Sequence, residues 1–257
     1  MDLKLNLNIA RLYKSNPQKI RIVTESWVKR NGYCPGCGKE LIEFENNKPV
    51  ADFYCIDCEE EFELKSKNAK NVVNKIVNGA YEKMIQRITS EHNPSFFLLT
   101  YNNTTLEVNN FLIIPRFYFL PEIIERRNPL SPTARRAGWV GCNILLNEIP
   151  KNGRIYFVKN SSIIDKTRVL ENWHKSSFLK TKKGETKGWI LDVMNCIDSI
   201  NKDVFYLDDL YKYEKRLKDK HPNNNFIRDK IRQQLQILRD KGIIEFLGRG
   251  KYRKVIL

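Results

Sequence analysis

The sequence predicts an α/β protein, with a mixed α/β core in residues 1–180 and a smaller α+β domain in residues 181–257. Three observations support this prediction. Two Cys-x-x-C pairs lie in the first quarter of the chain, helical and strand patterns alternate through the larger part, and three amphipathic helical patterns precede two short strands at the carboxyl end. A chain of 257 residues is long enough to bury one sizeable core with a small domain attached.

The first domain begins with a helix that starts after Ser15 and ends at Gly32, because a cap residue and a proline stand at one end and a glycine at the other. An apolar stripe at helical spacing predicts a second helix over residues 68–90. Short apolar runs predict strands over residues 62–65, 96–101, 106–114 and 154–159. This order is that of a mixed core with a site at the end of a strand.

The cysteines predict a structural zinc site. Four of the six stand in two Cys-x-x-C pairs, namely Cys34 and Cys37, then Cys55 and Cys58. Each pair can hold one side of a tetrahedral ion, and the interval between the pairs is typical of a four-thiolate zinc site. Four thiolates leave no open coordination position, so this zinc would not be catalytic. Cys142 and Cys196 lie among apolar residues and are expected to be buried free thiols.

A second metal site is predicted beside the zinc site. Asp52 precedes the second cysteine pair, and Glu63 and Lys65 follow it on one face of the expected central strand. Two carboxylates, with the backbone carbonyl of Leu64, could hold Mg²⁺, and the lysine could assist the water that attacks a phosphate. Glu61 lies on the same face and could replace one ligand. In the alternative interpretation, Glu63 and Lys65 are a surface pair on an edge strand.

The net charge of +15 favours a polyanionic partner, either nucleic acid or an anionic membrane surface. No apolar run approaches the length of a membrane span, and no basic amphipathic helix with an aromatic face stands out. Residues 128–143 combine Arg135, Arg136 and Trp139 in a segment broken by proline and glycine. Such a loop suits phosphate contact and base stacking, but the tryptophan could equally anchor the loop to the core.

The last third of the chain predicts a winged helix-turn-helix domain after a polar, basic linker at residues 179–187. Its third helix shows Arg232, Gln233 and Gln236 on the side away from the apolar stripe. Glutamine can pair with adenine, and arginine with guanine or phosphate, although most such helix faces are simply solvated. The glycine-rich tip of the following hairpin carries Arg249 and Lys251, which favours DNA as the partner.

Long stretches of this sequence resemble the DpnI family of methyl-directed type II restriction endonucleases. The resemblance is carried by residues 34–37, 49–55, 61–67, 132–139 and 231–240. It implies a PD-(D/E)XK nuclease core with a four-cysteine zinc insertion, a winged helix, and cleavage of double-stranded DNA at GATC sites that contain N6-methyladenine. Asp52, Glu63 and Lys65 match the catalytic positions of the family. Pro49 departs from the general superfamily pattern, because it stands three residues before Asp52.

The resemblance also implies a bacterial cytoplasmic protein that uses Mg²⁺ for catalysis and Zn²⁺ for structure. A monomer in solution is expected, but the residues leave the oligomeric state open. Trp139 is expected to contact the adenine methyl group, and the third helix of the winged helix to read the same mark independently. Two alternatives stay open from the residues alone. One is a zinc-containing regulator that binds DNA without cutting it, and the other is a repair nuclease that methylation does not direct.

Overall fold

The computed structural model describes residues 1–44, 51–90, 93–182 and 184–255. The chain forms two compact units, of which the first comprises Met1–Asn147 with Gly153–Trp173 and the second Glu148–Asn152 with His174–Leu257. None of the helices in the described ranges is long and apolar enough to cross a membrane. Pro49, singled out above for its spacing from Asp52, lies outside the described residues.

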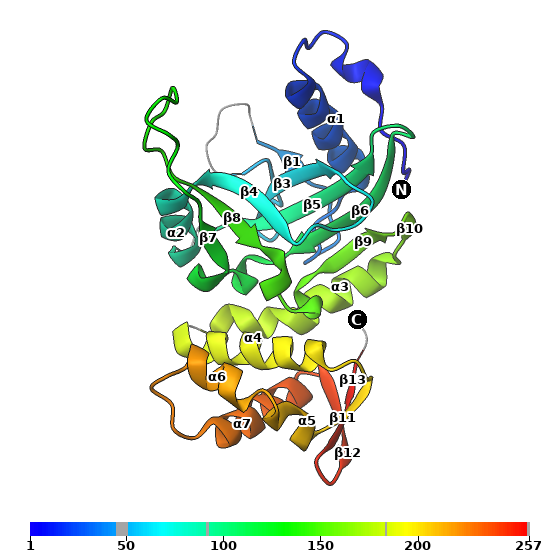
Figure 1. Cartoon of the computed structure of the whole chain (residues 1–257). Coiled ribbons are helices and arrows are strands. Elements are labelled where there is room, and N and C mark those ends of the chain that lie inside the picture. Colours follow the sequence, from blue (N-terminus) through cyan, green and yellow to red (C-terminus); the bar gives the residue numbers. More distant parts are fainter. Residues whose placement is uncertain (45–50, 91–92, 183, 256–257) are drawn as a thin grey trace. The chain divides into compact units, whose positions relative to one another are not determined.

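The first unit is built on a seven-stranded mixed sheet (Figure 1). Only the pairing of β3 with β5 is parallel, and the other neighbours are antiparallel. In spatial order the strands are β1 (Ile42–Glu43), β2 (Phe53–Tyr54), β3 (Glu61–Asn68), β5 (Ser95–Asn102), β6 (Glu107–Ile114), β9 (Ile155–Lys159) and β10 (Ser162–Ile163). The strands predicted over 62–65, 96–101, 106–114 and 154–159 are confirmed, and the first of them lies inside the sheet.

The core of this unit is aromatic. Phe97 lies at the centre of the sheet, where its ring stacks on Phe62 at 4.9 Å and approaches Phe111 at 5.0 Å. Helix α1 (Asn16–Asn31) lies against this sheet through Trp27, which is fully buried and meets Phe111 edge to face at 5.3 Å. The predicted first helix is therefore confirmed, with Ser15 as its N-cap and Gly32 as its C-cap.

The helix expected over residues 68–90 is wrong in its first half. β3 runs on to Asn68, residues 75–80 form strand β4 (Lys75–Ala80), and helix α2 spans only Tyr81–Thr89. Most apolar residues of the first half are β-branched, and Gly79 lies among them, so this part of the segment favours a strand over a helix. The apolar spacing fits a helix over the whole stretch, although the stretch contains a strand followed by a helix.

Strand β4 belongs to a second sheet, in which β8 (Gly141–Leu145) lies between β4 and β7 (Ile124–Arg126). Residues 127–140, here called the β7–β8 loop, connect β7 to β8 and project beyond the ends of these strands in Figure 1. Helix α3 spans Lys166–Ser176. Short 3₁₀ turns occupy Leu7–Ala10, Arg116–Tyr118, Pro121–Ile123, Leu146–Glu148, Lys151–Gly153 and Ser177–Thr181.

In the second unit the predicted helices and hairpin follow in the predicted order. These elements are α4 (Gly184–Ser199), β11 (Val204–Tyr206), α5 (Leu207–Tyr211), α6 (Glu214–Lys220), α7 (Ile227–Asp240), β12 (Ile244–Gly248) and β13 (Lys251–Lys254). Two details differ, because the second helix is divided into α5 and α6, and the unpredicted strand β11 pairs with β13 beside the hairpin.

The linker expected at residues 179–187 is also wrong in its bounds. Leu179 is fully buried within a 3₁₀ turn, and α4 already begins at Gly184. Lysines and other polar residues make up most of this stretch. Its one large apolar residue, Leu179, is buried and belongs to the second unit.

Candidate active site and nucleic-acid interface

The two Cys-x-x-C turns come together in the first unit. The four sulfur atoms of Cys34, Cys37, Cys55 and Cys58 all lie within 4.8 Å of one another. The sulfurs of Cys37 and Cys55, one from each pair, lie 3.5 Å apart. This arrangement brings four ligand atoms to one point, as a tetrahedral ion requires.

Each cysteine turn is closed by the backbone in the same way. The N–H of Cys34 donates to the carbonyl of Lys39 at 2.8 Å, and the N–H of Cys55 donates to the carbonyl of Glu60 at 3.0 Å. Each turn reverses through a residue with positive φ, Gly38 in the first and Glu59 in the second. Glycine reaches this conformation without strain, whereas glutamate rarely does, so the second turn is held against a local preference.

The cysteine cluster could hold zinc. Burial raises the pKa of the Cys34 thiol above its ordinary value and that of the Cys58 thiol to about 11. A cation that binds thiolates would compensate for this cost, and its binding would release the protons. Cys142 and Cys196 are buried free thiols outside the cluster, as predicted.

Asp52 is fixed against the central strand immediately before β2. Its backbone N–H donates to the carbonyl of Phe62 at 2.9 Å, and its side-chain Oδ2 accepts from the N–H of Leu64 at 2.7 Å. Within a strand, the N–H and C=O of one residue lie at the same edge. The carbonyl of Leu64 therefore faces the edge at which the Asp52 carboxylate lies.

Glu63 and Lys65 share the opposite face from Phe62, as the strand period predicts. Lys65 Nζ lies 2.5 Å from Glu63 Oε1, and Arg87 Nη1 from α2 lies 2.8 Å from Glu63 Oε2. The Glu63 side chain is only 14% exposed. The Lys65 side chain is 25% exposed, so the alternative of a surface pair is wrong. β2 pairs with β3 at Glu61 and Phe62, before these two residues in the strand.

The two carboxylates influence each other. Burial raises the pKa of Asp52, and the negative charge of Glu63 raises it further, against the N–H of Leu64, which lowers it. The two carboxylates and the carbonyl of Leu64 offer hard oxygen donors to a divalent cation. A bound cation would relieve the repulsion between the two carboxylates. Among the described residues, the cysteine cluster is the sole group of three or more His, Cys, Asp or Glu close enough to share an ion, so Glu61 does not join Asp52 and Glu63.

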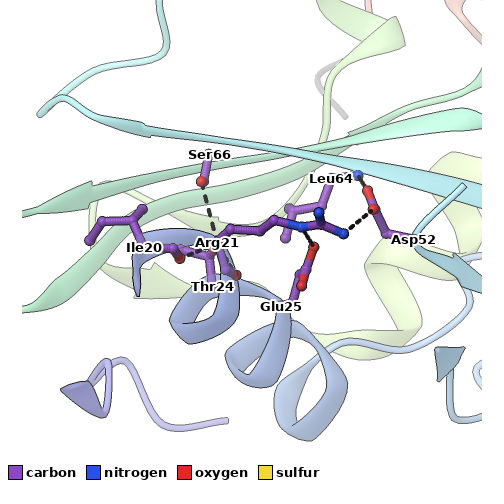
Figure 2. Close-up of polar contacts among 7 residues, drawn as sticks. All are labelled: Ile20, Arg21, Thr24, Glu25, Asp52, Leu64 and Ser66. Carbon is purple, nitrogen blue, oxygen red and sulfur yellow. Dashed lines mark hydrogen bonds and ion pairs between the residues drawn. The ribbon is translucent and has the colours of Figure 1, made fainter. Parts of the chain in front are cut away.

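Helix α1 adds residues that the sequence analysis missed (Figure 2). Arg21 Nε donates to Glu25 Oε1 at 2.6 Å, and its Nη2 lies 4.0 Å from Asp52 Oδ1. Thr24 is hydrogen-bonded to Ser66, the residue after Lys65, at 3.3 Å between hydroxyl oxygens. The spacing of Arg21 and Glu25 indicates an ion pair on a helix, but nothing local shows that the pair faces Asp52.

The β7–β8 loop carries the predicted arginines and tryptophan. Arg135 and Arg136 are exposed, Trp139 is half-buried, and the guanidinium of Arg136 lies 4.6 Å from the centre of the Trp139 ring. A Cβ atom at Gly141 would lie 2.9 Å from two carbons of this ring, so the ring rests on the backbone of Gly141. Trp139 thus combines an anchoring contact with a partly accessible ring.

In the second unit, the predicted DNA-binding residues of α7 are exposed. Arg232 donates to the hydroxyl of Tyr211 at 2.9 Å and is also paired with Asp229, while Gln233 and Gln236 lie on the same exposed side. These two contacts fix the guanidinium of Arg232.

The tip of the hairpin is a tight turn. Gly248, Arg249 and Gly250 all have positive φ, which places Arg249 at the exposed end. Lys251 lies at the base of the tip, with its Nζ 5.8 Å from the ring of Tyr206.

Two family models match this chain. The DpnI model, described as the Dam-replacing family, covers residues 1–182. The DpnI_C model, described as the Dam-replacing HTH domain, covers residues 185–254.

Proposed function

The chain belongs to the DpnI family, the Dam-replacing family, and from this membership we propose that it is a methyl-directed type II restriction endonuclease. We propose further that it hydrolyses double-stranded DNA at GATC sites that contain N6-methyladenine, with Mg²⁺ in a PD-(D/E)XK core. The observation that carries the proposal is that Asp52 is hydrogen-bonded to the N–H of Leu64, between Glu63 and Lys65, whose charges both act on the Asp52 carboxylate.

The donor set fits Mg²⁺, which prefers carboxylate and carbonyl oxygens. Asp52 and Glu63 would hold the ion, together with the carbonyl of Leu64. When bound, Mg²⁺ lowers the pKa of a coordinated water and withdraws charge from the phosphate. Lys65 would hold and orient the attacking water and offset the negative charge that develops on the phosphate.

The cysteine cluster would hold a structural zinc. Cys55 follows Asp52 by three residues, with strand β2 between them. Zinc at the four sulfurs would therefore fix the strand that presents Asp52, without taking part in hydrolysis. Removal of this zinc is expected to impair catalysis through the position of Asp52.

Reading N6-methyladenine requires a surface that buries a methyl group in the major groove and still accepts from the remaining N–H. The half-buried Trp139 ring, held by Gly141 and Arg136, would provide apolar contact with the methyl group. Gln233 and Gln236 on α7 would make a second reading in the winged helix, where the recognition helix enters the major groove. Arg135 and Arg249 would contact phosphates.

The proposal is tested with labelled duplexes that contain one GATC site with both, one or neither adenine methylated. We expect Mg²⁺-dependent cleavage of the fully methylated duplex and none of the unmethylated duplex. Equal cleavage of both would exclude methyl direction, and binding without cleavage of any duplex would favour a regulator.

Trp139→Ala is expected to reduce cleavage of the methylated duplex roughly 10-fold to 100-fold, because one apolar contact to a base is lost. Trp139→Phe, which retains a ring, should lose less. The measurement is the single-turnover rate of cleavage of the methylated duplex. An unchanged rate in Trp139→Ala would mean that the ring only anchors the loop.

Replacing both Arg249 and Lys251 by alanine is expected to weaken binding to methylated and unmethylated DNA alike. Each lost phosphate contact should reduce the slope of log affinity against log salt concentration by about 1. Arg253→Ala is the matched control, because Arg253 on the same hairpin is paired with Glu245 at 3.0 Å. If the control changed the slope as much as the double variant, the tip would not be the contact.

A further inference from the structure

We propose that Arg87 is a positioning residue for Glu63, and that helix α2 couples the β7–β8 loop to the Glu63 carboxylate. The inference rests on the proposed function, because it concerns the rate of the cleavage assigned to Glu63. It extends that function by connecting recognition at the loop to chemistry at β3 through specific contacts.

Glu63 is held from two sides. Lys65 contacts Oε1 at 2.5 Å and Arg87 contacts Oε2 at 2.8 Å. The three side chains are between 14% and 25% exposed, so water screens these pairs only partly. The planar guanidinium fixes the direction of a hydrogen bond more strictly than an ammonium does. Arg87 therefore determines how Glu63 is oriented toward Asp52.

The other end of α2 lies at the base of the β7–β8 loop. The backbone N–H of Tyr81, the first residue of α2, donates to the carbonyl of Val140 at 3.1 Å. Ala80, immediately before it, pairs with Gly141 in the register of β4 and β8. The guanidinium of Arg126, the last residue of β7 immediately before the loop, lies 5.9 Å from the centre of the Tyr81 ring. The first turn of α2 thus lies beside the residues at both ends of the loop.

Trp139 completes the connection, because its ring rests on Gly141 and it is followed directly by Val140. From Tyr81 to Arg87 the helix rises by roughly 9 Å, and its hydrogen bonds transmit a shift of the first turn to the last. DNA that moves the Trp139 ring is therefore expected to move the residues that hold α2, and with them the guanidinium on Glu63.

A second observation indicates that Arg87 does more than fill the core. Its Nη2 is buried and has no hydrogen-bond partner among the described residues. In native proteins, buried hydrogen-bond donors are nearly always paired. One arm of the guanidinium is therefore fixed on Glu63, and the other has no hydrogen-bond partner among the described residues.

The positioning role is tested by single-turnover cleavage of the methylated duplex, with DNA affinity measured separately in EDTA. Arg87→Ala should lower the rate about 10-fold to 100-fold, because a small misplacement of a catalytic group has this effect. Affinity should stay within about twofold, and Arg87→Lys should recover part of the rate. Lys83→Ala, which removes an exposed charge from the same helix, should change neither quantity.

The coupling is tested by combining Arg87→Ala with Trp139→Ala. If α2 connects the two residues, the double variant should be faster than the product of the two single losses predicts. Losses that multiply, or no loss in Trp139→Ala, would overturn the coupling. An unchanged rate in Arg87→Ala, or a loss of affinity in place of rate, would overturn the positioning role. If the unmodified protein does not cleave, the proposed function fails and not merely this inference.

Discussion

Asp52→Asn is expected to abolish cleavage of methylated GATC DNA, with a loss of about 1000-fold or more, and to leave DNA binding intact. The substitution keeps the size of the side chain and removes the negative charge that would bind Mg²⁺, and loss of one group that stabilises charge in the transition state commonly has an effect of this order. Single-turnover cleavage and gel-shift affinity, measured on the same duplex, separate the two quantities.

Glu63→Gln should have an effect of similar size, and Glu125→Gln is its matched control. Glu125 lies in β7, where it is paired with Lys75 at 2.7 Å and accepts from Asn143 at 2.6 Å, away from the pair on β3. The control should cleave at a normal rate. Normal cleavage by Asp52→Asn would mean that another carboxylate holds the cation.

Cys34→Ser is expected to remove bound zinc and to destabilise the first unit, with a loss on the order of 5 kcal/mol in the free energy of unfolding. For a domain of this size the melting temperature should fall by roughly 10–20 °C. The reason is that a single ion joins four ligands from two turns that are distant along the chain, and one of these turns holds Glu59 in a conformation that glutamate rarely adopts. Metal analysis and thermal melting measure the two effects.

Cys142→Ala is the control for this experiment, because Cys142 is buried but lies outside the cluster. It should retain one zinc per chain and lose only about 1 kcal/mol of stability, as a small core truncation does. If Cys34→Ser melted like the unmodified protein, or if the protein bound no zinc, the cluster would not be a structural zinc site.

The parts of the site that sequence reasoning found are those that local pattern determines. The period of a strand places Glu63 and Lys65 on one face whatever surrounds them, and a Cys-x-x-C turn brings two sulfurs together by itself. Arg87 and Arg21 could not be found in this way. Their partners lie 24 and 31 residues away along the chain, and only the packing of α2 and α1 against the sheet brings them together.

The fold shows the same limit at residues 68–90. The apolar residues from Val73 to Ile88 fit one helical stripe, but the tertiary structure places Ile76, Val77 and Ala80 in a strand paired with β8. That pairing depends on residues 141–145, far along the chain, and a periodicity argument does not include it. Strand β11 was missed because its three residues are too few to show a period.

The most direct test of the central claim is digestion of one plasmid, prepared with and without adenine methylation at GATC, in Mg²⁺ and in EDTA. We expect discrete fragments from the methylated plasmid in Mg²⁺ and intact DNA in the other three reactions. Fragments from the unmethylated plasmid would contradict methyl direction, and cleavage that persists in EDTA would contradict the dependence on Mg²⁺.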